Sequence, residues 1–319
     1  MSALLVLTLH HIGDVLFTEP AIAALKAGHP EKPLLVVTSQ EGEAVLKGHP
    51  AIDQLWVRVR TVRGFGRLLR WLRQHRATAA VSFSPSSLGL ALATLLSGAP
   101  RRFGFAFRFH VSIFFTDKLP MQPQRHVVDD YLALAKAAGG KKERRIPRLF
   151  LRPEEEAWGR EWLRAQGWDE TTPLLGCHPF SSVASKEWGL TNFAILLQWV
   201  RKELGWLPIV FGSLGEREKA EKLAAEGKGV AAAGKLSLRQ FIAVAKWCTG
   251  FIGGDSGPIH LAAALGVPTV ALFGPTDPHR SGPLGNHVWV AKSPTKRMED
   301  LSVETVRELV KAVLGGISG

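Results

Sequence analysis

Short apolar runs alternate with longer segments of mixed polarity along both halves of the chain. An apolar run bounded by turn residues is typical of a buried strand, and apolar positions spaced three or four apart are typical of a helix. In the first half, the pattern predicts strands at Leu4–Leu9, Pro33–Thr38, Gln54–Val59 and Ala79–Phe83. It predicts helices near Pro20–Ala27, Glu41–Lys47, Phe65–Gln74 and Leu88–Leu96.

The first half ends in a segment that has the character of a linker. A strand or loop rich in Arg and Phe is expected at Arg101–Val111, and a helix at Val127–Ala138. Residues Lys141–Pro153 are basic and contain two prolines, which disfavour regular structure. We therefore expect one domain over residues 1–152 and a second over residues 153–319.

The second half repeats the same alternation. Its strands are expected at Leu174–His178, Pro208–Phe211, Val230–Ala233 and Val267–Phe273. Its helices are expected at Glu154–Gln166, Asn192–Leu204 with Thr191 as its cap, Glu216–Ala225, Leu238–Trp247 and Val303–Leu314. Strands and helices in regular alternation predict parallel βα units, so the fold class is α/β with helices on both faces of each sheet.

Charge and composition narrow the range of partners. The 319 residues are enough for two domains, and the formal net charge of +12 favours anionic partners such as nucleic acid, an acidic membrane or a phosphorylated glycolipid. Nucleic acid is the weaker option because zinc-finger spacings and aromatic RNA-binding motifs are absent. The two cysteines argue against a disulfide scaffold and for a reducing compartment. We expect neither a membrane span nor a signal peptide.

The strongest local pattern lies at residues 249–278, with the sequence TGFIGGDSGPIHLAAALGVPTVALFGPTDP. It predicts a strand, a tight turn at Gly253–Gly254, a helix and a second strand. Asp255 and Ser256 are good caps, and Pro258 suits the first position of a helix. The free N–H groups and the positive end of the helix dipole would suit a phosphate. An ordinary α/β unit has the same pattern.

A second candidate loop follows the first predicted strand, in HHIGDVLFTEPAIAALKAGHP. Gly13 permits a sharp bend, and Asp14 then lies at the carboxyl end of a strand, where open α/β sheets place their ligands. On the residues alone, capping the helix that follows is the favoured role for Asp14. His10 and His11 could orient a ligand or serve the structure.

Two loops of the second half carry further polar candidates. The loop GCHPFSSVASKEWGL contains Ser181, Ser182 and Lys186, and a mobile ammonium group suits a phosphate, although exposed loops are the ordinary place for lysine. The segment FGSLGEREKAEKLA contains Glu216. Its carboxylate could accept both hydroxyls of a ribose, or lie favourably in the first turn of a helix.

These four segments, in their order along the chain, resemble those of the heptosyltransferase family. Its members are the ADP-heptose:lipopolysaccharide glycosyltransferases of glycosyltransferase family 9. DSGPIHLAAALGVPTVALFGPTDP is similar to the family's C-terminal signature, and the resemblance covers nearly the whole chain. It implies the GT-B fold, in which two Rossmann-like domains with parallel sheets face each other across a cleft. The N-terminal domain would bind the acceptor and the C-terminal domain the nucleotide sugar, with the last helix packing back on the N-terminal domain.

The resemblance also implies roles for single residues. Asp14 would be the catalytic base that takes a proton from the acceptor hydroxyl as its oxygen attacks the anomeric carbon. Ser181, Ser182 and Lys186 would approach the donor pyrophosphate, and Glu216 would bind the ribose.

In the signature segment, Ser256 and Gly257 would offer N–H groups to the phosphates. Asp255 would hold the turn or meet sugar hydroxyls, and Thr276 would close over the sugar. His260 would hydrogen-bond donor oxygens as a neutral imidazole, or else be a core residue.

The acceptor side is less well defined. Gly13, Arg60 and Arg63 are expected to contact the acceptor, because the family's acceptors are acidic Kdo or phosphorylated heptose and arginine pairs well with such anions. The family's acidic-Gln-Gly element is replaced here by FSPSS at Phe83–Ser87, so the identity of the acceptor stays open.

The sequence therefore predicts an enzyme that moves heptose from ADP-heptose to an inner-core acceptor of lipopolysaccharide, with inversion. ADP-heptose would be a co-substrate, with no cofactor and no metal, and Lys186 and the helix N-terminus would stabilise the departing diphosphate. The expected partners are the anionic glycolipid and the cytoplasmic face of the inner membrane, not nucleic acid.

Two alternatives stay open: a related GT-B transferase that uses another nucleotide sugar, and a protein that binds a nucleotide sugar without turnover. A Rossmann oxidoreductase is disfavoured because no G-x-G-x-x-G follows the first strand.

Overall fold

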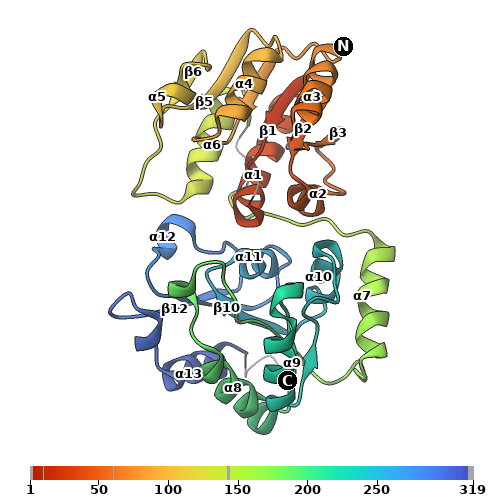
Figure 1. Cartoon of the computed structure of the whole chain (residues 1–319), viewed down its shortest axis with the longest axis vertical. Coiled ribbons are helices and arrows are strands. Elements are labelled where there is room, and N and C mark those ends of the chain that lie inside the picture. The colour runs from red at the N-terminus through yellow and green to blue at the C-terminus, as the bar shows by residue number, and fades with distance from the viewer. Residues whose placement is uncertain (1–2, 10, 60, 142–143, 315–319) are drawn as a thin grey trace. The chain divides into compact units, whose positions relative to one another are not determined.

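The computed structural model describes residues 3–9, 11–59, 61–141 and 144–314, and it divides into two compact units, residues 1–150 and 151–319 (Figure 1). The first unit therefore ends two residues before the boundary expected from the sequence. Each unit is built on one six-stranded parallel sheet. The α/β class with two Rossmann-like domains is thus confirmed. No helix in the described ranges is long and apolar enough to cross a bilayer.

In the first unit, the strand order is β3-β2-β1-β4-β5-β6. The strands are β1 Leu4–Leu7, β2 Leu34–Thr38, β3 Gln54–Val57, β4 Ala79–Ser82, β5 Arg101–Phe105 and β6 Asp117–Leu119. The helices are α1 Ile12–Gly28, α2 Gln40–Leu46, α3 Val62–Gln74, α4 Leu88–Leu96, α5 Phe109–Ser112 and α6 Val127–Ala137. In register, Leu7 of β1 pairs with Val37 of β2 and with Ser82 of β4.

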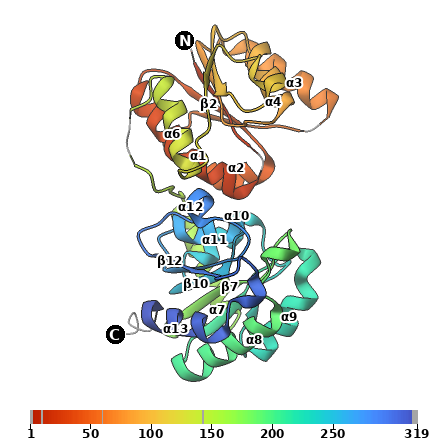
Figure 2. The same ribbon diagram turned by 90° about the vertical axis from the view of Figure 1, so that its left-hand side faces the viewer.

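Helices cover both faces of this sheet. Figure 2 shows α1 and α6 on one side of the sheet and α3 and α4 on the other. Leu68 and Leu72 of α3 and Leu90 of α4 are buried in one apolar cluster with Leu5 and Leu7 of β1. Residues 5 and 7 point to the same face because side chains alternate along a strand. Leu5 and Leu7 therefore belong to the core layer between the sheet and helices α3 and α4.

Helix α1 begins at Ile12, eight residues before the start that the sequence predicts. Because proline is common in the first turn of a helix, Pro20 led us to expect that the helix starts there. In the structure, Pro20 lies inside α1. All residues from Val15 to Leu25 are buried, so no polar stripe marks the helix. Gly13 is helical in the first turn, so the sharp bend expected there is wrong.

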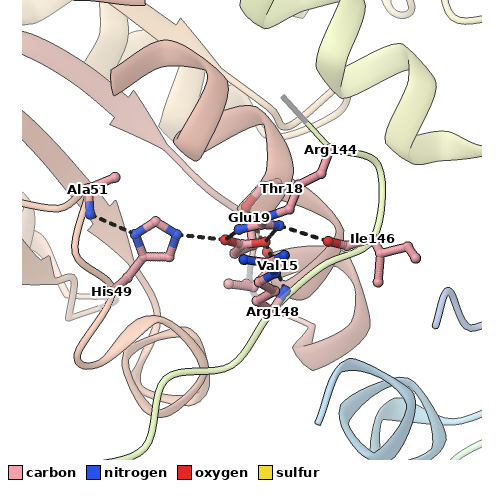
Figure 3. A network of polar contacts seen from close by, with 8 residues as sticks. All are labelled: Val15, Thr18, Glu19, His49, Ala51, Arg144, Ile146 and Arg148. Atoms are coloured by element: carbon pink, nitrogen blue, oxygen red, sulfur yellow. Dashed lines mark hydrogen bonds and ion pairs between the residues drawn. The ribbon is translucent and has the colours of Figure 1, made fainter. Parts of the chain in front are cut away.

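A buried carboxylate ties the end of the first unit to α1 (Figure 3). Glu19 of α1 is 1% exposed and accepts hydrogen bonds from the Arg144 guanidinium at 2.7 Å and from the Arg148 backbone N–H at 2.9 Å. The Nε2 atom of His49 donates to it at 2.7 Å, because its Nδ1 atom accepts from Ala51. Burial works to raise the pKa of Glu19, but the hydrogen bonds from Arg144 and His49 hold it below its usual value.

In the second unit, the strand order is β12-β11-β10-β7-β8-β9. The strands are β7 Leu174–His178, β8 Leu207–Val210, β9 Val230–Ala231, β10 Gly250–Gly254, β11 Thr269–Phe273 and β12 Val288–Lys292. The helices are α7 Pro153–Ala165, α8 Leu190–Trp199, α9 Arg217–Glu226, α10 Leu238–Ala245, α11 Gly257–Ala264, α12 Pro278–Ser281 and α13 Val303–Leu314. Short turns are η1 Ala184–Lys186, η2 Val200–Leu204, η3 Leu214–Glu216 and η4 Met298–Asp300.

The last helix, α13, packs on α8 and β12 of its own unit, with Val306, Val310 and Leu314 buried in that core. One expectation for this unit is wrong. Thr191 lies inside α8, whose N-cap is Gly189. The backbone of Gly189 has φ +92°, a conformation that glycine adopts without strain and threonine does not, so the chain turns into the helix there.

Candidate functional site

The donor-site candidates of the second unit lie at one edge of its sheet. They follow β7, β8 and β10, which are neighbours at the centre of the strand order. Because all the strands are parallel, their carboxyl ends meet at the same edge. The chain runs outward from β7 to β8 and β9, then returns to β10 on the other side. Open α/β sheets bind ligands at such a switch point.

Two glycines let β10 and the loop after β7 approach each other closely. A Cβ atom on Gly253 would lie 2.7 Å from the carbonyl oxygen of His178, and one on Gly254 would lie 3.0 Å from that of Lys186. Both glycines lie within β10 and neither has a positive φ. Close packing, and not the tight turn expected from the sequence, is therefore the reason for glycine at these positions.

Asp255 is the centre of the polar contacts at this edge. Its carboxylate is 2.6 Å from the ammonium of Lys186 and accepts a hydrogen bond from the Thr276 hydroxyl at 2.8 Å. The Nε2 atom of His260 lies 3.6 Å from the other carboxylate oxygen. Three separate segments of the chain thus converge on one carboxylate. Asp255 thus links the loop after β7, the loop after β11 and helix α11.

The charge of Asp255 is strongly stabilised, although its side chain is only 9% exposed. Burial by itself raises the pKa of a carboxyl group. Hydrogen bonds from His260, Lys186 and Thr276 outweigh this and hold the pKa of Asp255 well below its usual range. The carboxylate therefore stays ionised and keeps the Lys186 ammonium at the start of α11.

Helix α11 begins at this point, as the sequence predicts. Ser256 is its N-cap and Pro258 lies in its first turn. The Ser256 side chain does not cap the helix; its Oγ atom lies 3.3 Å from Nδ1 of His178. Within the ranges that the structure describes, the backbone N–H groups of Ser256 and Gly257 have no acceptor. A helix N-terminus with free donors and a nearby ammonium is suited to an anion.

His178 is a site residue that the sequence reasoning missed. It is the last residue of β7, beside Gly253 of β10. Burial lowers the pKa of His178 to about 4, and the nearby Glu216 carboxylate opposes this only in part. The imidazole is therefore neutral at pH 7. Its position at the carboxyl end of a central strand is the sequence signal that could have identified it as a candidate.

Glu216 and Ser181 have structural partners in their own loops. Glu216 accepts a hydrogen bond from the backbone N–H of Ser213 at 2.6 Å and so closes the η3 turn. The N–H of Ser181 donates to Glu187 at 3.0 Å, and Ser182 is exposed on the same loop. The proximity of Glu216 to His178 places it at the same sheet edge as Asp255.

The candidates of the first unit follow strands of the other sheet. Asp14 is half-buried in the first turn of α1, directly after β1, and Arg63 is exposed in the first turn of α3, after β3. Both segments therefore lie at the carboxyl edge of that sheet. His10 and Arg60 lie outside the described residues. Among the residues that the structure describes, no three His, Cys, Asp or Glu side chains are grouped so that they could hold a metal ion.

Comparison with known proteins gives consistent matches. The family model of glycosyltransferase family 9 (heptosyltransferase) matches residues 65–311. Lipopolysaccharide heptosyltransferase 2 of Salmonella typhimurium strain LT2 is 27% identical over 306 residues, which cover 88% of this chain and 85% of that protein.

Solved structures give the same picture of the fold. A glycosyltransferase family 9 protein from Veillonella parvula aligns over 99% of this chain and 97% of its own, with a TM-score of 0.89 and 23% identity. The ADP-heptose LPS heptosyltransferase II of E. coli aligns over 99% and 100%, with a TM-score of 0.85 and 22% identity.

Proposed function

The chain belongs to glycosyltransferase family 9, the heptosyltransferase family, and is a glycosyltransferase; on this basis we propose that it transfers heptose from ADP-heptose to an inner-core acceptor of lipopolysaccharide. The names of its relatives support both substrates, since one is a lipopolysaccharide heptosyltransferase and another an ADP-heptose LPS heptosyltransferase. The single observation that carries the donor assignment is the Lys186–Asp255 ion pair beside the free N-terminus of α11.

In the proposed complex, the ADP diphosphate lies at the N-terminus of α11. The N–H groups of Ser256 and Gly257 donate to phosphate oxygens, and Lys186 contributes a positive charge from the side. Ser181 and Ser182 extend this contact from the preceding loop, and Glu216 accepts from the ribose hydroxyls.

The proposed reaction is a direct displacement. Asp14 takes the proton of the acceptor hydroxyl, the acceptor oxygen bonds to the anomeric carbon, and the bond from that carbon to the diphosphate oxygen breaks. ADP leaves with the bonding electrons, so negative charge grows on the diphosphate where Lys186 and the α11 dipole stabilise it. Attack from the face opposite the leaving group inverts the anomeric centre. Metal is not required for this charge balance.

The acceptor is proposed to be an anionic glycolipid that ends in Kdo or heptose, with Arg60, Arg63 and the backbone at Gly13 contacting it. Such an acceptor is anchored in a membrane, so the proposed site of action is the cytoplasmic face of the inner membrane.

A transfer assay tests the proposal. Purified protein is incubated with ADP-heptose and with acceptors that end in Kdo or in heptose, with and without EDTA. Mass spectrometry should show the gain of one heptosyl residue on one acceptor class, undiminished by EDTA. Release of ADP without a glycosylated product, or transfer only from another nucleotide sugar, would contradict the proposal.

A further inference from the structure

Most of the protein's net positive charge comes from one segment of the first unit. Residues 54–116 contain ten arginines and no Asp, Glu or Lys. They therefore supply ten of the twelve net positive charges of the chain. The segment covers β3 to β5 and the helices α3, α4 and α5. No acidic side chain within the segment can neutralise this charge, and of its arginines Arg101 pairs with the adjacent Asp117.

Helix α3 presents four of these arginines on one stripe. Their spacing of four, three and three residues puts them on the same side of a helix, and all four are exposed: Arg63, Arg67, Arg70 and Arg73. We call these four residues the arginine face. None of them has an ion pair or a side-chain hydrogen bond with another residue in the ranges that the structure describes.

The arginine face is unfavourable without an anionic partner. Like charges three and four residues apart repel each other, and no carboxylate separates these. The opposite side of the same helix is fixed, because Leu68 and Leu72 are buried in the core of the first unit. The helix therefore cannot turn its arginines toward another surface of its own unit.

Bulky apolar side chains are exposed in the same segment of the chain. Val62 is 91% exposed in the first turn of α3, and Phe109 is 84% exposed in α5. Val59, Leu88 and Phe107 are also more than half exposed. We call these five residues the apolar rim. Isolated exposed apolar residues are ordinary, but the segment 54–116 holds seven of the twelve large ones in the described part of the chain.

The apolar rim and the arginine face belong to one layer of the unit. The rim residues follow β3, β4 and β5, so their segments start from the same carboxyl edge of the sheet. Helix α3 contacts α4, and α4 contacts α5, so the three helices form a continuous layer. Figure 2 shows α3 and α4 on one face of the sheet. Asp14 follows β1 at this same edge.

We propose that this layer is a docking surface for an anionic lipid bilayer. The guanidinium groups of the arginine face would contact lipid phosphates, and the apolar rim would enter the boundary between headgroups and acyl chains. Nucleic acid also binds arginine stripes, but its phosphates give no favourable environment for exposed Val62, Leu88 and Phe109. The choice of a membrane over nucleic acid rests in part on the proposed function. A lipid-anchored acceptor would reach the carboxyl edge of the sheet from the bilayer.

Vesicle flotation tests the docking surface directly. The probes are vesicles of phosphatidylethanolamine with about one third phosphatidylglycerol, and neutral phosphatidylcholine vesicles. The variant Arg67→Gln/Arg70→Gln/Arg73→Gln keeps good helix-forming residues and leaves Arg63, a proposed acceptor contact, in place. The matched control is Lys219→Gln/Lys222→Gln/Lys228→Gln, which removes the same charge from exposed positions of the second unit.

We expect the wild type to bind the anionic vesicles, and the arginine variant to bind them at least about tenfold more weakly, while the lysine control changes less than about twofold. The variant Phe107→Ser/Phe109→Ser should bind the anionic vesicles more weakly than the wild type at high salt, because salt screens the charge attraction and leaves the apolar contact. Equal weakening by both triple variants, or no weakening by the arginine variant, would overturn the proposal. So would duplex DNA binding that needs these arginines while vesicle binding does not.

Failure of this surface and failure of the proposed function give different results. ADP binding in calorimetry reports on the second unit, and the arginine variant should keep it. The same variant should keep transfer to a water-soluble acceptor fragment and lose transfer to acceptor in vesicles. If the protein binds no ADP but still binds vesicles through these arginines, the docking surface is supported and the donor assignment is wrong.

Discussion

The ammonium of Lys186 lies 2.6 Å from a carboxylate oxygen of Asp255, although the two residues are 69 positions apart in the chain. The contact joins the loop after β7 to the end of β10, at the point where the strand order of the second sheet reverses. A single cation is thus held beside the N-terminus of α11 before any ligand is bound. This preorganisation lowers the cost of ordering the loop when a diphosphate binds.

Replacement of the cation should weaken nucleotide binding specifically. Lys186→Ala should weaken ADP binding by about 1.5–3 kcal/mol, the usual range for a hydrogen bond to a charged group, which is roughly 10- to 150-fold in Kd. Lys186→Arg should recover only part of this, because the planar guanidinium differs in reach and shape. Calorimetry with ADP measures the effect. Adenosine is the control: if its affinity falls as much as that of ADP, Lys186 holds the loop and does not contact the pyrophosphate.

Loss of the proposed base should affect turnover and not donor binding. Asp14→Asn should lower kcat by at least about 100-fold, the lower end of what a general base contributes, with ADP affinity unchanged. Because Asp14 also lies in the first turn of a helix, Glu43→Gln in the first turn of α2 is a matched control for the loss of a dipole-stabilising charge. Near-normal turnover in Asp14→Asn would show that the carboxylate serves only the helix.

The buried Glu19 should be important for stability. Glu19→Gln leaves the Arg144 guanidinium without its ionised partner in a buried setting, and breaking such a pair costs about 3–5 kcal/mol of unfolding free energy. Urea denaturation of the full chain measures this. Glu31→Gln, at an exposed position, should change stability by less than about 0.5 kcal/mol. A loss below about 1 kcal/mol for Glu19→Gln would mean that the network contributes little.

The neutral His178 should make the protein less stable in mild acid. Burial holds its pKa at about 4, whereas an unfolded histidine titrates near about 6.5. Between these values the unfolded chain takes up a proton that the folded chain does not, so stability falls as the pH decreases from about 6.5 to about 4.

Replacement of this imidazole isolates the effect. In His178→Gln, the urea midpoint should fall less between pH 7 and pH 4.5 than in the wild type. The exposed His279→Gln should follow the wild-type pH profile. A His178→Gln profile parallel to the wild type would show that this imidazole is not held neutral in the folded protein.

The parts of the fold that could be predicted are those with a local signal. The strands Leu174–His178 and Leu34–Thr38 are short apolar runs, and Pro258 marks the first turn of helix α11. The edge strands β6 and β12 were missed, because β6 has a single apolar residue and the short apolar run of β12, Val288–Ala291, is mostly only partly buried. The early start of α1 was missed, because full burial removes the stripe on which a helix prediction depends.

The candidate site could be predicted as a set of loops but not as a network. Strand ends are visible in the sequence, so Lys186 and Asp255 could both be assigned to one edge. Their direct pairing depends on how closely two strands approach, and the close contact that Gly253 permits with His178 sets this distance. His178 itself reads as the end of an apolar strand, and only its packing shows that it is held neutral beside Ser256.

The most direct test of the central claim is calorimetry of the wild-type protein against ADP, UDP and GDP, followed by the matching sugar donors. The account predicts that ADP binds at least about tenfold more tightly than UDP and GDP, and that Lys186→Ala removes most of this binding. Tighter binding of UDP or GDP, or ADP binding that survives Lys186→Ala unchanged, would contradict it.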